Sequence, residues 1–209
     1  MKRLLLEQEI KTFLHVKQVY NMKTHNVLVV VDAQNDFITG SLANPVANER
    51  VPNICKLIED HDWDLIVTTY DTHQPDYLKT KEGEKLPVPH CIYREHGWQL
   101  DDRIIDALDT VFHRENGPQQ ISVYKPTFGS EDLVDHIWDC CEFEPADEVN
   151  IVICGFCTDI CVVSNALILK ANFYNFGDIK VVANACAGVT PESHEAALTV
   201  MRSCQINII

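Results

Sequence analysis

Reactive side chains follow four apolar, strand-like runs of this sequence of 209 residues. They are a carboxylate, a carboxylate with an imidazole, an amine, and a short turn with a thiol. These residues are Asp32, Asp71, His73, Lys125 and Cys161. The carboxyl ends of parallel strands meet at one edge of a sheet, and ligands bind there. We therefore expect one site that combines thiol chemistry with acid–base chemistry and metal binding.

Cys161 has the sequence surroundings of a nucleophile. It ends the stretch GFCTDIC, residues 155–161, in which Thr158 or Asp159 is expected to be the N-cap of the following helix. The helix dipole would lower the pKa of a thiol in that first turn, and free N–H groups there can hold an oxyanion. Cys157 is expected to contribute only its main-chain N–H. A single cysteine is more often a buried structural residue, so position and neighbours carry this hypothesis.

Asp32 and Lys125 are the candidate partners of this thiol. A carboxylate beside a lysine can accept the thiol proton, and the lysine can hold the carboxylate or stabilise the thiolate. The alternative interpretations are ordinary ones, because an aspartate after a strand is often a turn former and a lysine is usually solvated. The nine histidines of the chain also leave a histidine-based triad open.

Asp71, His73 and His90 form a candidate metal site. Asp71 and His73 are two residues apart in an extended segment, so their side chains face the same way. One carboxylate and two imidazoles suit one zinc, iron or manganese ion. The competing ligands nearby in the sequence are His96, Asp76 and Cys91.

The elements that must position these residues alternate along the chain. Apolar, β-branched runs at 27–31, 65–69, 121–124, 149–154, 179–183 and 206–209 predict strands. Amphipathic segments at 50–59, 102–111, 131–141, 158–171 and 192–203 predict helices between them. This alternation predicts an α/β protein with a doubly wound parallel sheet of about six strands and helices on both faces.

Composition and charge exclude several function classes. With 17 basic and 31 acidic residues the net charge is −14, which disfavours nucleic acid and anionic membrane surfaces as partners. The chain has nine cysteines, several within apolar runs, and no run near the roughly 20 apolar residues of a membrane span. We expect no secretory signal, because charged residues interrupt the apolar ones in the first 20 positions. We expect a cytoplasmic protein with reduced thiols that acts on a small molecule and forms a homo-oligomer.

Two segments stand apart from this pattern. Residues 1–22 predict an amphipathic helical extension, and residues 23–209 a single domain. The irregular stretch 72–99 is rich in proline, glycine, lysine and glutamate. A loop of that length inside a compact domain is usually functional.

Four motifs together resemble those of the cysteine-hydrolase superfamily that contains nicotinamidases and isochorismatase-like proteins, the nicotinamidase branch in particular. They are DAQNDF at 32–37, DTHQP at 71–75 with PHC at 89–91, YKP at 124–126, and GFCTDICV at 155–162. The resemblance runs from about Val27 to the C-terminus. It implies the isochorismatase-like hydrolase fold and hydrolysis of a small carboxamide, nicotinamide first, through a thioester.

The resemblance also implies a role for each motif residue. Cys161 would be the nucleophile, Asp32 the acid and base, and Lys125 the third catalytic residue. A cis peptide would join Phe156 to Cys157, and the N–H groups of Cys157 and Cys161 would form the oxyanion hole. Phe37 would pack on the substrate ring. One divalent transition-metal ion, zinc before iron or manganese, would be held by Asp71, His73 and His90 and bind the pyridine nitrogen.

Departures from the nicotinamidase pattern concern the substrate more than the chemistry. Pro87 stands where nicotinamidases often carry a tryptophan that lines the pyridine pocket, and Tyr77 lies near the place of a second histidine found in some relatives. Two alternatives follow. One is an isochorismatase-like hydrolase of another small amide or ureido compound, although isochorismatases lack the metal triad. The other is a non-catalytic thiol or metal redox sensor built on Cys154, Cys157 and Cys161.

Overall fold

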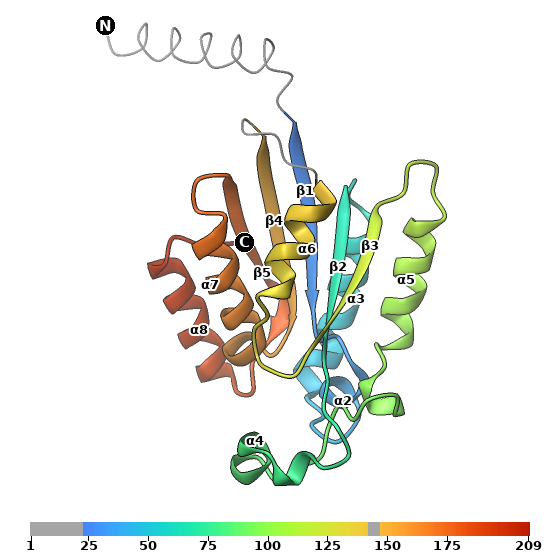
Figure 1. Cartoon of the computed structure of the whole chain (residues 1–209), viewed down its shortest axis with the longest axis vertical. Helices are drawn as coiled ribbons and strands as arrows, with labels where there is room; N and C mark the ends of the chain where they lie inside the picture. Colours follow the sequence, from blue (N-terminus) through green and yellow to red (C-terminus); the bar gives the residue numbers. More distant parts are fainter. Residues whose placement is uncertain (1–22, 142–146) are drawn as a thin grey trace, which may run out of the picture.

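Six parallel strands form one sheet in this computed structural model, which describes residues 23–141 and 147–209 (Figure 1). The order across the sheet is β3-β2-β1-β4-β5-β6. The strands are β1 (Thr24–Val31), β2 (Leu65–Asp71), β3 (Gln119–Lys125), β4 (Glu148–Phe156), β5 (Gly177–Ala187) and β6 (Asn207–Ile208). The chain extends the sheet on one side of β1 and then returns to the other side with β4. This is the doubly wound arrangement.

The central strands are apolar on both faces. The side chains of Val27–Val31 in β1 have no exposed surface, and Ile151 and Ile153 of β4 are equally buried. Such a continuous apolar pattern is typical of a parallel sheet that helices cover on both sides. The predicted fold class is confirmed.

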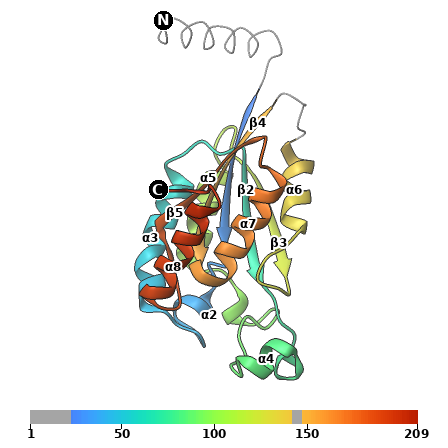
Figure 2. The ribbon, with the colours of Figure 1, turned by 90° about the vertical axis from the view of Figure 1, so that its left-hand side faces the viewer.

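Helices lie on both sides of the sheet (Figure 2). On one side α3 (Pro45–Glu59) packs against α5 (Asp102–Phe112), and on the other side lie α6 (Asp132–Cys141) and α7 (Val163–Asn172). The last helix, α8 (Pro191–Ser203), contacts α7, β5 and β6. Among the helices of the described ranges, none combines the length and the apolar character that a membrane crossing requires.

The order in which the chain adds strands reverses between β1 and β4, and a glycine allows the ends of these two strands to approach. Gly155 has a φ of +118°, and a Cβ atom there would lie 2.0 Å from the carbonyl oxygen of Val31. Only glycine fits this close contact without strain. The crevice at such a reversal is the usual ligand site of an open α/β sheet, so the fold places the ends of β1 and β4 at the expected position of a site.

The long irregular stretch after β2 is folded back onto the sheet end. The N–H of His73 donates to the carbonyl of Cys91, and the N–H of Tyr93 donates to the carbonyl of His73. The stretch contains the short helix α4 (Lys81–Lys85), capped by the hydroxyl of Thr80. With α2 (Asn35–Ile38) it lies at the end of the sheet toward which the strands point (Figure 1). The predicted helical extension, residues 1–22, lies outside the described residues.

Candidate active site and metal centre

A buried carboxylate, amine and thiol meet at the carboxyl ends of the strands, near the point between β1 and β4 where the strand order reverses. Lys125 Nζ lies 2.6 Å from Asp32 Oδ2 and 3.5 Å from Cys161 Sγ. Asp32 and Lys125 have no exposed surface, and Cys161 is 4% exposed. Asp32 follows β1, Lys125 ends β3, and Cys161 lies in the turn after β4. The structure therefore brings together the three residues that the sequence analysis grouped as nucleophile, base and lysine.

Asp32 is held by a neighbour that the sequence analysis did not identify. Thr69 Oγ1 donates to Asp32 Oδ1 at 2.6 Å, while Lys125 contacts the other carboxylate oxygen. Asp32 itself has a left-handed φ of 47°, and its N–H donates to the carbonyl of Thr69 at 3.2 Å. Threonine is common in strands, so nothing in the sequence marked Thr69. Only the parallel pairing of Val31 with Thr69 places it there.

The charges of Asp32 and Lys125 act on each other inside the fold. Burial raises the pKa of Asp32, although the Lys125 charge opposes this. Burial alone would lower the pKa of Lys125, but the charges of Asp32, Cys161 and Asp71 outweigh it and raise that pKa above its ordinary value. The lysine therefore stays charged. A carboxylate with a raised pKa is a stronger base than a solvated one.

The thiol of Cys161 is held protonated rather than ionised. Burial, followed by the charge of Asp32, keeps its pKa well above the ordinary value, and Lys125 opposes this. The prediction that a helix dipole lowers this pKa is wrong, because the buried position beside a carboxylate outweighs the dipole. The thiol needs a base to become a nucleophile, and Asp32 lies in the same cluster.

The turn that carries Cys161 is a single turn of π-helix, Thr158–Val162, and α7 begins only at Val163. The N–H of Val162 donates to the carbonyl of Cys157, five residues back, at 3.0 Å. The peptide bond between Phe156 and Cys157 is cis, at the position that the resemblance implies. The predicted N-cap at Thr158 or Asp159 is wrong, because both side chains bond to residues that follow β5 instead.

Asn165 of α7 holds this turn by hydrogen bonds, and the sequence analysis did not identify it either. Its side chain is fully buried and donates to the carbonyls of Cys161 at 2.9 Å and Phe128 at 3.2 Å. Its Oδ1 accepts from the N–H of Ser130 at 3.1 Å. Asn165 thereby joins the turn to the segment that follows Lys125. Its position four residues after Cys161, one helical turn away, is the one signal that could have found it.

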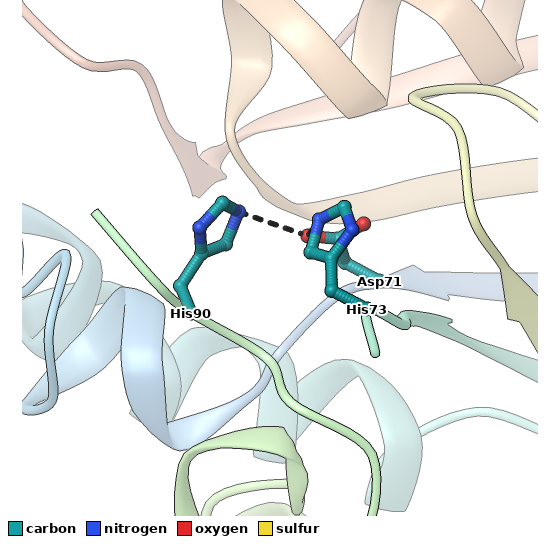
Figure 3. A group of neighbouring side chains, drawn as sticks. All are labelled: Asp71, His73 and His90. Atoms are coloured by element: carbon teal, nitrogen blue, oxygen red, sulfur yellow. Dashed lines mark hydrogen bonds and ion pairs between the residues drawn. The ribbon is translucent and has the colours of Figure 1, made fainter. Parts of the chain in front are cut away.

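Asp71, His73 and His90 converge at the end of β2 (Figure 3). Asp71 Oδ2 lies 3.1 Å from His73 Nε2 and 3.2 Å from His90 Nε2. All three residues are buried, and their ligand atoms lie within 4.8 Å of one another. The structure thus gathers the predicted ligand set.

The donor set of this cluster fits a transition-metal ion. Ligands about 2.0–2.2 Å from a tetrahedral zinc ion are themselves roughly 3.3 Å apart, close to the distances from Asp71 Oδ2 to the Nε2 atoms of His73 and His90. His90 Nδ1 donates to the carbonyl of Val88 at 2.8 Å, which directs Nε2 into the cluster. An imidazole ligand is usually oriented in this way by a bond at its other nitrogen.

Glu82 joins the cluster from α4 and was not among the predicted ligands. Its Oε1 lies 3.5 Å from His73 Nε2 and 3.7 Å from His90 Nε2. Tyr77 packs beside the same histidines, with ring centroids 4.6 Å from His73 and 5.0 Å from His90. Glu82 lies in the charged stretch Lys81–Lys85, where sequence composition alone indicates a solvated helix. Only the folding back of the loop makes it a neighbour.

Three other residues were considered as metal ligands in the sequence analysis: His96, Asp76 and Cys91. None of them belongs to the ligand group found among the described residues. His96 is exposed in a short turn at His96–Trp98, and Asp76 precedes another short turn at Tyr77–Lys79. Cys91 is buried, and its N–H donates to Asp36 Oδ2 at 2.7 Å. Asp36 therefore holds the backbone next to His90.

Gln34 performs a similar function for Asp71. Its Nε2 donates to the Asp71 carbonyl at 2.9 Å, and its Oε1 accepts from the Asp71 N–H at 2.8 Å. The DAQNDF segment therefore supports the metal cluster as well as providing Asp32.

A cavity of about 780 Å³ connects the thiol with the metal cluster. Cys161, Cys157, Asp71, Glu82 and His90 line it. The rest of its wall is largely apolar and includes Phe37, Leu42, Leu86, Phe128, Ile160 and Val189. A small aromatic molecule in this cavity can contact the thiol and the metal ligands together.

Comparison with known proteins gives a family and several relatives. Residues 26–209 match the isochorismatase domain family. The chain is 27% identical to the nicotinamidase of Schizosaccharomyces pombe over 221 aligned positions, which cover 90% of this chain and 94% of that protein. It is 34% identical to the nicotinamidase of Saccharomyces cerevisiae over 143 positions, covering 66% and 59% of the two chains.

A solved structure shares the fold. The pyrazinamidase of Pyrococcus horikoshii, solved in complex with zinc, superposes with a TM-score of 0.66 at 24% identity. The superposition covers 88% of this chain and 98% of that one. At this identity the likeness concerns the arrangement of the sheet and its helices.

Proposed function

The chain belongs to the isochorismatase family, and we propose that it is a cysteine-dependent amidohydrolase that converts nicotinamide and water to nicotinate and ammonia. One observation carries the proposal. The thiol of Cys161, with the Asp32–Lys125 pair behind it, lines the same cavity as Asp71 and His90. The two nicotinamidase relatives support the choice of substrate.

In the proposed reaction Asp32 accepts the proton of Cys161. The thiolate attacks the carboxamide carbon, and the N–H groups of Cys157 and Cys161 stabilise the oxyanion, each such donor typically contributing about 3–4 kcal/mol. Asp32 then protonates the departing nitrogen, and ammonia leaves a thioester on Cys161.

Water completes the cycle. Asp32 takes a proton from the water molecule that attacks the thioester, and nicotinate leaves as Cys161 regains its proton. Lys125 stays charged throughout and keeps the carboxylate in place, since its Nζ lies 2.6 Å from Asp32 Oδ2. The raised pKa of Asp32 suits a group that must accept and donate a proton in each cycle.

We propose that Asp71, His73 and His90 hold one divalent transition-metal ion, with zinc favoured over iron or manganese. One carboxylate and two imidazoles suit zinc, and the Pyrococcus horikoshii pyrazinamidase was solved with it. A bound ion supplies a Lewis-acid contact for the pyridine nitrogen. Phe37 lies at the edge of His90, with 5.8 Å between ring centroids, and would pack on the substrate ring.

Two further properties belong to the proposal. All nine cysteines are free thiols in the described structure, which supports a reducing, cytoplasmic location. A homo-oligomeric state stays a prediction from the sequence.

The direct test is product formation from nicotinamide, followed as both ammonia and nicotinate. We expect kcat/KM for nicotinamide to exceed that for benzamide by about tenfold or more, because benzamide lacks the ring nitrogen that positions the substrate. Equal kcat/KM values for the two amides would refute the part of the proposal in which the metal ion positions the substrate through its ring nitrogen. No turnover of either amide would favour another small amide or ureido substrate.

His90→Ala tests the metal assignment. The purified wild-type chain is expected to carry about one transition-metal ion, and the variant to lose it, since two remaining protein ligands rarely hold such an ion. Elemental analysis of both proteins measures this. His96→Ala is the matched control, because His96 is exposed and outside the cluster. Metal lost from His96→Ala but retained in His90→Ala would mean that the wrong histidine is assigned.

Glu82→Gln tests the residue that only the fold revealed. The variant keeps its size but loses its charge 3.5 Å from His73 Nε2. We expect its zinc dissociation constant to rise about tenfold, measured by competition with a chromogenic chelator. Glu84→Gln on the same helix is the control, because Glu84 pairs with the exposed Lys81. Equal zinc affinity in the two variants would assign Glu82 no part in binding.

A further inference from the structure

A histidine outside the cavity contacts the turn that carries the nucleophile. Thr158 Oγ1 and His194 Nδ1 are 2.8 Å apart. Thr158 is the first residue of the π-helical turn and has no exposed surface. His194 lies on α8 and is half-buried. It is neither a cavity-lining residue nor a member of the metal cluster. The reaction proposed above assigns it no role.

The start of α8 is well suited to act as a fixed support. Thr190 is its N-cap and forms a capping box with Ser193, and Pro191 follows in the first turn. The His194 N–H donates to the carbonyl of Thr190 at 3.0 Å. A capping box satisfies free N–H groups of a helix end and defines where the helix begins, so the backbone of His194 is held independently of the turn.

A second bond joins the same two segments. The N–H of Val189 donates to Asp159 Oδ1 at 3.0 Å. Gly188 makes this approach possible, because a Cβ atom there would lie 2.9 Å from Cα and Cβ of His194. Consecutive side chains of the nucleophile turn, Thr158 and Asp159, are thus both bonded to residues 189–194.

Among the described residues, the hydrogen bonds of Thr158 and Asp159 to residues 189–194 are the side-chain bonds that hold the start of this turn. Its N-cap, Cys157, makes no side-chain capping hydrogen bond. The side chains of Ser164 and Asn165 donate to the carbonyls of Ile160 and Cys161, which lie farther along the turn. Burial lowers the pKa of His194, so its ring is neutral near pH 7 and Nδ1 can accept the hydroxyl proton of Thr158.

We propose that His194 is a positioning residue for the nucleophile, acting through Thr158 to hold the π-helical turn and keep the thiol of Cys161 buried beside Asp32 and Lys125. The kinetic consequence rests on the function proposed above. The effect on the thiol itself does not, because it is measurable without substrate.

Thr158→Val and His194→Ala each remove the bond and leave every proposed catalytic residue intact. We expect kcat for nicotinamide to fall about tenfold in each, because a misplaced nucleophile loses its alignment. KM should change less than about twofold, because neither residue lines the cavity. The double variant should be no slower than either single variant, because both remove one interaction.

Conservative replacements separate positioning from mere packing. His194→Asn can place a hydrogen-bonding atom where Nδ1 lies, whereas His194→Gln reaches further, toward the position of Nε2. We expect His194→Asn and Thr158→Ser to restore most of the lost kcat and His194→Gln not to. His136→Ala, which removes a half-buried histidine from α6, is the control and should match the wild type.

Alkylation by iodoacetamide, mapped by peptide mass spectrometry, gives the readout that needs no substrate. Because burial is the main cause of the raised pKa of Cys161, releasing the turn should make alkylation of this thiol about fivefold faster near pH 7. Cys154 and Cys186, buried elsewhere in the core, should stay protected. Faster labelling of all three thiols would indicate general loosening and overturn the proposal.

The two readouts distinguish the possible failures. Wild-type protein without activity on nicotinamide, but with selective labelling of Cys161 in Thr158→Val and His194→Ala, would refute the proposed function and support the role of His194. Normal kcat and unchanged labelling in both variants would refute the role of His194 alone. Loss of kcat in His194→Asn equal to that in His194→Ala would also overturn it.

Discussion

Cys161→Ala is expected to reduce hydrolysis of nicotinamide by at least about 10⁴-fold, because it removes the atom that forms the thioester. Cys157→Ala should retain substantial activity, since only the main-chain N–H of Cys157 takes part. Both residues line the cavity, so the comparison separates the nucleophile from a neighbouring thiol. Ammonia release under saturating nicotinamide measures both variants.

A trapping experiment supports this comparison. Hydroxylamine attacks a thioester, so wild-type protein turning over nicotinamide in its presence should release nicotinohydroxamate at the expense of nicotinate. Cys161→Ala should form none. Equal losses of activity in Cys161→Ala and Cys157→Ala, or hydroxamate formation without Cys161, would refute the assignment of the nucleophile.

Asp32→Asn and Lys125→Met are expected to lower kcat by about 10²-fold or more, by different routes. Asp32→Asn removes the base but preserves the shape of the side chain. Lys125→Met removes the charge 2.6 Å from the carboxylate and 3.5 Å from the thiol. A near-normal kcat in either variant would refute the proposal that Asp32, Lys125 and Cys161 act together in catalysis.

The same variants should move the pKa of Cys161 in opposite directions. The charge of Asp32 raises that pKa and the charge of Lys125 lowers it. The pH at which Cys161 is half ionised, followed by the rate of iodoacetamide labelling, should therefore fall in Asp32→Asn and rise in Lys125→Met. Asp32→Asn would then combine a more reactive thiol with slower turnover, which is the behaviour expected when a catalytic base is lost.

Stability gives a further check on the buried pair. Both side chains have no exposed surface, and removing one partner of such a pair typically costs about 3–5 kcal/mol, because the other charge is left uncompensated. We expect the Asp32→Asn/Lys125→Met double variant to regain much of this stability in urea unfolding and none of the activity. Recovery of activity would mean that the pair serves folding alone.

Much of the fold could be predicted because the central strands of this sheet can be recognised from short segments of the sequence. A run such as Val27–Val31 is apolar at every position, and in a parallel sheet both of its faces are buried. Reactive residues that follow such runs necessarily meet at one sheet edge. Asp32, Lys125 and Cys161 could therefore be grouped from the sequence, as could Asp71, His73 and His90.

Other features depended on contacts between distant segments. Thr69, Glu82 and His194 belong to ordinary strand or helix sequences, and each became part of the site only through neighbours from another element. The start of the helix after β4 was predicted wrongly for the same reason. Thr158 and Asp159 have side chains that cap helices well in isolation, but the residues after β5 bind them instead.

The sequence by itself determined which segments form strands, that these strands form a parallel sheet covered by helices, and the chemical types of the site residues. These features follow from apolar periodicity and local motifs. The tertiary structure decided the protonation of the site. A cysteine in the first turn of a helix should have a lowered pKa, yet burial beside Asp32 raises the pKa of Cys161. Desolvation and charge pairing depend on what surrounds a group in space, and only the folded chain specifies those surroundings.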